Sequence, residues 1–155
     1  MNLSYLSRKP LNNKLLLRII AIIAMVGFAD AVYLTANYYL GTPVPCLLTG
    51  GCDKVLTSTF SSFSGVPLSL LGLLFYATVF VLVTMLEISW KDSTLKVLFG
   101  MTVAGFVVSI ILLGLQLFVI NAICFYCMIS LISSTTLFVL AIIIKYHHKR
   151  SMISV

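Results

Sequence analysis

The sequence predicts an all-α integral membrane protein, a four-transmembrane-helix bundle whose large first extracytoplasmic loop carries a short amphipathic helix. Three observations support this prediction. Of the 155 residues, 61% are hydrophobic and only 9% are charged. The apolar residues fall in four runs, each long enough to cross a hydrocarbon core about 30 Å thick. The charged residues stand beside these runs, so a water-soluble single domain is excluded.

We expect one membrane domain covering residues 1–155. Its spans are predicted at about residues 19–40, 66–88, 97–120 and 122–144. The external loop is predicted at residues 41–65.

The external loop begins with Pro43 and Pro45, which stop the first helix. Asp53 to Ser62 is predicted to form the amphipathic helix on the membrane surface. Val55, Leu56 and Phe60 would face lipid or protein, so that this helix acts as a lid. The second span then starts at Val66, with Pro67 in its first turn.

The basic residues predict the orientation of the chain in the membrane. They cluster in the amino-terminal tail, in the connection between the second and third spans, and in the carboxyl-terminal tail. Four spans place these clusters on one side, so the positive-inside rule predicts two cytoplasmic termini. The net charge of +6 is therefore a topology signal and not a nucleic-acid site, because no basic stripe is interleaved with aromatic residues. His147 and His148 belong to the solvated tail.

The first apolar run also has a competing interpretation as a cleavable signal peptide. Ala29-Asp30-Ala31 has the small-x-small shape of a cleavage site after a basic amino-terminal region. The apolar character continues to Leu40, which favours a membrane span. Asp30 is the only acid well inside an apolar run, and it is interpreted either as a proton-handling or ligand-contacting group or as a neutral structural carboxyl.

Four cysteines are the main candidates for chemistry. Cys46 and Cys52 bracket a glycine-containing stretch of the external loop, whereas Cys124 and Cys127 form a C-x-x-C pair at the start of the last span. The predicted topology brings all four to the non-cytoplasmic face, where disulfides persist. The N–H groups of a first helical turn favour a thiolate, so Cys124 is expected to have the lowered pKa and the greater reactivity.

Two less specific interpretations compete with a redox role for the cysteines. Free cysteines in a membrane helix are often only small buried apolar side chains. Four cysteines could also bind zinc, but Phe125, Tyr126 and Met128 make apolar surroundings for the second pair, and we expect no metal.

Three segments of the chain carry a resemblance to a known family. They are residues 51–58 (GCDKVLTS), 65–76 (GVPLSLLGLLFY) and 124–127 (CFYC). In this combination the chain, from about residue 22 to 144, resembles the vitamin K epoxide reductase family and specifically its bacterial members.

The resemblance implies a four-helix bundle around a quinone, either menaquinone or ubiquinone. It implies that a separate periplasmic thioredoxin-fold thiol oxidase is reoxidised and that disulfide bond formation is thereby supported. By position, Cys46 would exchange with that partner, Cys52 would exchange with Cys124, and Cys127 would face the quinone. The protein would lie in the bacterial inner membrane with its redox cysteines on the periplasmic side.

The quinone pocket is expected among the spans, with five candidate contact residues. These are Asp30, Ser69, Phe75, Tyr76 and Phe125. The chain departs from the family at Leu68, where many members have Asn, so another group must contact the quinone carbonyl. Some bacterial members carry a fused thioredoxin-like domain, and here the partner is expected to be a separate protein.

Two other functions remain open from the sequence. One is membership of the other quinone-coupled four-helix disulfide-forming family, in which the C-x-x-C pair lies in the first external loop. The other is a non-enzymatic membrane subunit whose cysteines form structural disulfides on the outer face.

Overall fold

Four long helices account for most of the protein, because each apolar run is long enough to satisfy its backbone hydrogen bonds within one helix. The computed structural model describes residues 3–42, 44, 51–56, 58, 61–63 and 65–153. The long helices are α1 (Leu3–Leu40), α3 (Leu68–Ile88), α4 (Asp92–Gly114) with its π-helical continuation η1 (Leu115–Ile120), and α5 (Phe125–Ile153). In the described part of the chain, four helices are long and apolar enough to cross a membrane. The predicted four-helix membrane fold is confirmed.

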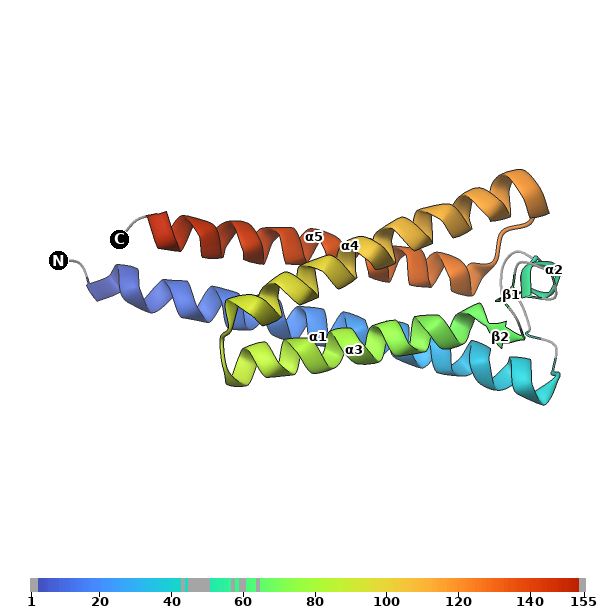
Figure 1. The fold of residues 1–155 in the computed structure, drawn as a ribbon, viewed down its shortest axis with the longest axis horizontal. Helices are drawn as coiled ribbons and strands as arrows, with labels where there is room; N and C mark the ends of the chain where they lie inside the picture. Colours follow the sequence, from blue (N-terminus) through green and yellow to red (C-terminus); the bar gives the residue numbers. More distant parts are fainter. Residues whose placement is uncertain are drawn as a thin grey trace.

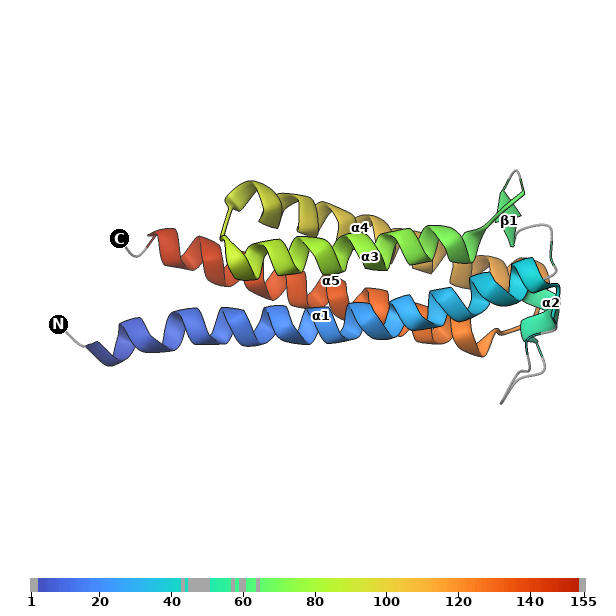
Figure 2. The same ribbon diagram turned by 90° about the horizontal axis from the view of Figure 1, so that it is seen from below.

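The small elements lie together at one end of the bundle. The five-residue helix α2 (Cys52–Leu56) and an antiparallel hairpin of β1 (Ser62–Phe63) and β2 (Val66–Pro67) are found there, next to the connection between η1 and α5. Both termini and the α3–α4 connection lie at the opposite end (Figures 1 and 2). The chain therefore has two distinct ends, one with the termini and one with the loop elements.

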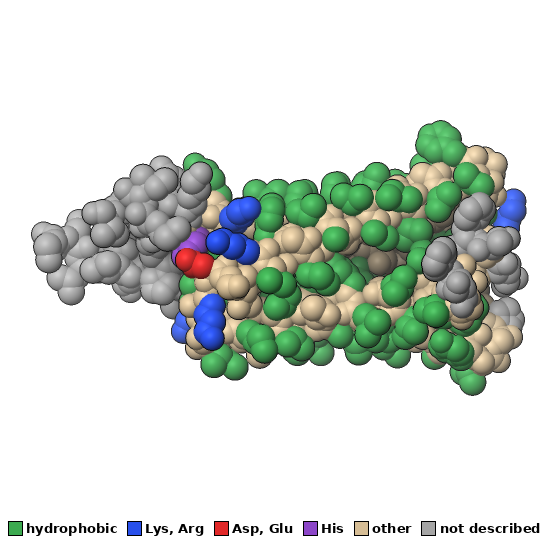
Figure 3. Space-filling model, viewed as in Figure 1, with side chains coloured by type: hydrophobic (Ala, Val, Ile, Leu, Met, Phe, Trp, Pro, Cys, Tyr) green, Lys and Arg blue, Asp and Glu red, His purple; other side chains and the backbone are tan. Residues whose placement is uncertain are grey.

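The core follows the length of the bundle, with α1 packed on α3 and α5, and α4 packed on the same two helices. Tyr76, Val79 and Leu137 are among the side chains that are almost completely buried in it. Large apolar side chains also cover the outside, for example Ile111 and Phe118, the latter 83% exposed. Figure 3 shows apolar side chains along the whole bundle and a group of charged ones near the end that holds the termini. An apolar outer surface of this extent suits lipid and not water.

The first three long helices each begin at a different residue from the predicted span. The basic segment before residue 19 is helical and continues α1, so the predicted polar tail is an extension of the first helix. The second long helix begins at Leu68, because Pro67 is its N-cap in extended conformation (φ −66°, ψ 140°) and closes strand β2. The third begins at Asp92, five residues before the predicted start, because the mostly polar residues from Asp92 to Lys96 form the first turn of this helix and not a separate connection.

The predicted amphipathic helix from Asp53 to Ser62 is shorter than expected. α2 ends at Leu56, and both the backbone N–H and the hydroxyl of Ser58 donate to the carbonyl of Val55. Ser62 belongs to β1 instead. Local side chain-to-backbone bonds of this kind compete with helix continuation. Phe60, which is predicted to face lipid or protein on this helix, lies outside the described residues.

The predicted start of the last span at residue 122 is also wrong by three residues. Asn121 adopts a left-handed conformation (φ 52°), and α5 begins only at Phe125. The residues between them form an extended connection, and this displacement changes the position of the C-x-x-C pair relative to the helix.

Candidate functional site

The connection between η1 and α5 is held in place by one residue, Gln116. The main-chain carbonyl of Gln116 accepts the N–H groups of Asn121 and Ala122, the latter at 3.1 Å. Its side-chain oxygen Oε1 accepts the N–H of Cys124 at 3.0 Å. Gln116 is 4% exposed, so the bonds are shielded from water. The turn that presents Cys124 is therefore fixed from within the bundle.

Cys124 occupies the N-cap position of α5 and not a position inside the helix. Its carbonyl accepts the N–H of Met128 at 3.1 Å, which is the first hydrogen bond of the helix. Cys127 lies three residues further on, in the first turn, and its thiol hydrogen-bonds Cys124. The two sulfurs are therefore neighbours, although only one of the two residues lies within the helix.

This N-cap position changes the acidity of Cys124. The hydrogen bond from the Cys127 thiol, together with the backbone N–H groups of Cys127 and Tyr126, lowers the pKa of the Cys124 thiol from 9.0 to about 7 against the opposing effect of burial. The direction agrees with the expectation from the sequence. Near neutral pH a large fraction of Cys124 is thiolate, which is the nucleophilic form.

The loop cysteine Cys52 packs directly beside this helix start. Cys52, Val55 and Cys124 form one buried cluster, and both cysteines are 0% exposed. Gly51 allows the close approach, because a Cβ there would lie 2.7 Å from the carbonyl oxygen of Ile123. Gly51, next to Cys52, therefore packs against Ile123, next to Cys124.

The two sets of cysteines differ in oxidation state in this structure. Cys52 is disulfide-bonded, whereas Cys124 and Cys127 are free thiols. Cys46, the other predicted loop cysteine, lies outside the described residues.

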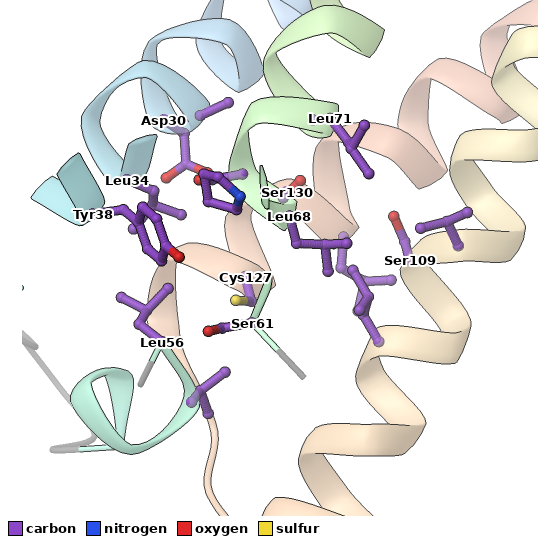
Figure 4. A pocket seen from close by; sticks show the side chains of 18 of the residues that line it. Asp30, Leu34, Tyr38, Leu56, Ser61, Leu68, Leu71, Ser109, Cys127 and Ser130 are labelled. Carbon is purple, nitrogen blue, oxygen red and sulfur yellow. The ribbon is translucent and has the colours of Figure 1, made fainter. Parts of the chain in front are cut away.

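A cavity of about 800 Å³ lies between the helices on the other side of Cys127. Figure 4 shows Asp30, Leu34 and Tyr38 contributed by α1, and Leu68 and Leu71 by α3. The same view shows Ser109 on α4, Cys127 and Ser130 on α5, and Leu56 and Ser61 at the loop end. Val55 and Leu56 of α2 line this end, so the short helix borders both the cavity and the cysteine cluster.

Four of the five predicted pocket residues line this cavity. They are Asp30, Ser69, Phe75 and Tyr76. Phe125 is not among the described residues that line it; its ring packs against the cluster of Cys52 and Cys124. The reason is its position, since the helix starts at Phe125 itself and not at residue 122.

Glycines on neighbouring helices position the two aromatic residues of α3. A Cβ at Gly27 would overlap the ring of Tyr76, and a Cβ at Gly105 would overlap the ring of Phe75. The Tyr76 hydroxyl bonds Ser130, at 3.0 Å from its carbonyl oxygen and 2.9 Å from its hydroxyl. The aromatic wall of the cavity is therefore held by close packing on both sides.

Ser69 is already engaged within the protein, because its hydroxyl accepts a hydrogen bond of 3.0 Å from Thr35. Asp30 differs from it: within the described residues its carboxyl group has neither a hydrogen bond nor an ion pair, and it borders the cavity. A polar group in that setting is available to a ligand or to water.

Sequence reasoning missed Gln116 and the serines of the cavity wall. Gln116 is the only glutamine in the chain and stands inside an apolar run, which was the available signal. The other missed residues are Ser130 and the pair Ser109 and Ser134, whose hydroxyls are 2.7 Å apart. Their place at the cavity depends on how the helices pack, which their positions in the sequence do not indicate. In the part of the chain that the structure describes, no group of three or more His, Cys, Asp or Glu residues could hold a metal ion.

The model of the vitamin K epoxide reductase family matches residues 18–142, which is most of the chain. The chain belongs to the vitamin K epoxide reductase family. A vitamin K epoxide reductase family protein is a membrane thiol oxidoreductase, and the family is associated with quinones. The matched region includes the loop, the cavity walls and the C-x-x-C pair, so the geometry described above falls within the family's domain.

The cavity fits a quinone as this family would require. Its volume lies in the range of small-molecule sites, about 300–1,000 Å³, and like those sites it has mainly apolar walls and a few polar groups. One thiol, that of Cys127, belongs to the wall. Apolar walls, a few polar contacts and a thiol are what a membrane quinone that oxidises thiols needs.

Proposed function

We propose that this protein is a quinone-dependent thiol oxidoreductase that reoxidises a separate periplasmic thioredoxin-fold thiol oxidase and so supports disulfide bond formation. One observation carries the proposal: the C-x-x-C pair joins two sites. Cys124 shares a buried cluster with Cys52, while Cys127 lines the cavity. Electrons that enter at the loop would therefore have a short path to the cavity by thiol–disulfide exchange.

Thiol–disulfide exchange accounts for the first half of the path. The partner's dithiol would reduce the loop disulfide through Cys46. The Cys52 thiolate then attacks the sulfur of Cys124 in a Cys124–Cys127 disulfide, and Cys127 leaves. Cys46 attacks Cys52 and releases Cys124, which is a good leaving group because its pKa is lowered to about 7.

The second half of the path ends in the cavity. A quinone bound there, menaquinone or ubiquinone, would accept two electrons and two protons. The chain would supply the two electrons by forming the S–S bond between Cys124 and Cys127. One proton would come from the S–H of Cys127 and the other from the S–H of Cys124 or, when Cys124 is a thiolate, from water, so the exchange balances without a metal. Asp30, Phe75 and Tyr76 would contact the quinone, with Asp30 placed to hold or pass a proton at its carboxyl oxygen.

The location of these sites suggests how the protein lies in the membrane. The described basic side chains at the end with the termini include Lys14, Arg18, Lys91 and Lys96, whereas Lys54 is found at the loop end. By the positive-inside rule we propose cytoplasmic termini and periplasmic cysteines in a bacterial inner membrane. The partner would then reach α2 from the periplasm.

Variants of the two cysteine pairs test the proposed relay. Cys46→Ala should abolish oxidation of a thioredoxin-fold partner but retain quinone reduction by dithiothreitol, because a small dithiol can reach the inner pair directly. Cys127→Ala should abolish both activities. The measurements are the ultraviolet absorbance of the quinone and the thiol content of the partner.

Two outcomes would contradict the proposal. Equal loss of both activities in Cys46→Ala would rule out a relay through the loop. No quinone reduction by the unsubstituted protein with any dithiol would instead favour a non-enzymatic membrane subunit.

A further inference from the structure

Gln116 is an amide buried within a membrane-spanning segment, and such a group is costly there unless its polar atoms find partners. It is 4% exposed and lies in the π-helical turn η1, at the loop end of the bundle. Short π-helical turns are frequently found at functional sites. The hydrogen bonds of its side chain therefore show what the residue is placed to do.

The amide oxygen has a defined partner. The N–H of Cys124 can only donate, so the side chain must present Oε1 to it, at 3.0 Å. Oε1 and Nε2 diverge from the same carbon atom, so Nε2 points away from Cys124. The donor character of the Cys124 N–H therefore fixes the orientation of the Gln116 amide.

The amide nitrogen has no partner within the described residues, although it carries two N–H donors. It is also not among the described side-chain nitrogen and oxygen atoms that are both sealed from solvent and unpaired. Nε2 therefore keeps some accessible surface, and the space that Gln116 lines is the cavity. A donor at the cavity wall is available to a ligand.

Other polar groups of the cavity are less available as donors. The Tyr76 hydroxyl bonds Ser130, and the hydroxyls of Ser109 and Ser134 bond each other. Leu68, which also lines the cavity, offers no donor. Nε2 of Gln116 is thus a donor of the cavity wall that no hydrogen bond among the described residues already uses.

We infer that Gln116 holds Cys124 with its amide oxygen and donates an amide N–H to a carbonyl oxygen of the quinone in the cavity. This inference rests on the proposed function, which supplies the quinone. Quinone carbonyl oxygens only accept hydrogen bonds, and Nε2 only donates them. Donation becomes stronger as negative charge develops on that oxygen during reduction. One side chain would then connect the acceptor to the cysteine helix start.

Because the chain contains a single glutamine, the contact can be observed directly. Protein labelled with ¹⁵N only at the glutamine side-chain amide, and with ¹³C at the methionine methyl groups, is titrated with menadione. Cys127→Ser is present throughout to prevent turnover. The methyl signal of Met128, which lines the cavity, reports occupancy, and the amide signal of Gln116 reports hydrogen bonding. Methylnaphthalene, which has no carbonyl groups, is the control ligand.

We expect menadione to shift the Met128 methyl signal and to move one Nε2 proton downfield, with the same saturation curve. Methylnaphthalene should shift only Met128. A Met128 shift without movement of the amide proton would overturn the role of Gln116 and leave the proposed function intact. If menadione shifts neither signal and is not reduced by the unsubstituted protein, the proposed function fails as well.

A substitution tests the same contact energetically. Gln116→Met has a similar length and no donor, and it should weaken menadione binding by about three- to tenfold, the loss expected for one hydrogen bond. The matched control is Phe118→Leu in the same π-helical turn, whose side chain is exposed and should leave binding unchanged. Equal affinity in Gln116→Met and the parent protein would contradict the inference. If Gln116→Met does not fold, the menadione titration of labelled protein that retains Gln116 still tests the inference.

Discussion

At the scale of single residues, the main feature is the asymmetry between two cysteines that are only three positions apart. Cys124 sits at the N-cap, where backbone N–H groups and the thiol of Cys127 converge on its sulfur. Cys127 is one turn deeper and borders an apolar cavity. One cysteine is thus suited to exchange with a disulfide, and the other to contact a ligand.

The lowered pKa of Cys124 predicts how its reactivity depends on pH. In reduced protein, alkylation of Cys124 by iodoacetamide should rise with pH through a midpoint near 7, because a lowered pKa means that the thiolate is present above that value and is lost below it. Mass mapping of the alkylated site provides the measurement.

Replacing the neighbouring thiol provides the control for this prediction. In Cys127→Ala the largest stabilising contact is gone, so the midpoint for Cys124 should move upward toward the ordinary value of 9.0. A midpoint near 9 in both proteins would show that the helix start does not activate Cys124.

At the scale of elements, the decisive contact is between the loop helix α2 and the start of α5. The N–H of Val55 donates to the carbonyl of Gly51 at 3.1 Å, which holds α2 to Gly51. Gly51 in turn packs against Ile123. Val55 and Cys52 then face Cys124. Because Gly51 has no side chain, α2 can pack against the start of α5.

Gly51→Ala should therefore separate the loop cysteine from the C-x-x-C pair. The added methyl group would lie 2.7 Å from the Ile123 carbonyl oxygen, and overpacking of this kind costs about 1–3 kcal/mol. This free energy corresponds to a population of the arrangement in which residue 51 packs against Ile123 that is roughly 5- to 150-fold lower. Partner-driven quinone reduction should fall accordingly, whereas reduction driven by dithiothreitol should persist.

The matched substitution for this test is Gly100→Ala in α4, where an added Cβ meets nothing within 4 Å. It should leave both activities unchanged. If Gly51→Ala retains full partner-driven activity, the close approach at Ile123 is not required for exchange.

At the scale of the whole molecule, chemistry and charge are separated along the bundle. The loop helix α2 and the start of α5 lie at the end opposite the termini (Figure 1), and Val55, Leu56 and Cys127 of these two elements line the cavity. At the other end Arg18 pairs with Glu87 at 3.0 Å. This polarity is what a protein needs if it collects electrons on one side of a membrane and is oriented by positive charge on the other.

The proposed orientation can be checked with two exposed lysines at opposite ends. In intact cells a membrane-impermeant maleimide should label Lys54→Cys without lysis, because the loop end faces outward. Lys96→Cys should be labelled only after lysis, and it serves as the matched control. Both side chains are exposed, so accessibility within the fold does not limit the reaction. The reverse pattern would invert the proposed topology.

The four spans and the C-x-x-C pair could be predicted from the sequence, because hydropathy and spacing depend only on residue order. The helix starts at residues 68 and 125 could not, because a proline N-cap and the left-handed Asn121 act through backbone geometry that hydropathy does not record. The short length of α2 was missed for a similar reason, since the bonds from Ser58 that end it are local side-chain contacts.

The sequence by itself determined that this protein lies in a membrane, which family it resembles and which cysteines are the candidates for its chemistry, since each follows from residue type and spacing. Only the tertiary structure decided that Gln116 holds Cys124, that Gly51 admits Cys52 to the cluster, and that Phe125 faces the cysteines instead of the cavity. These three facts depend on contacts between segments distant in the sequence or on the register of a helix start. Such contacts arise from packing, which no local pattern of residues encodes.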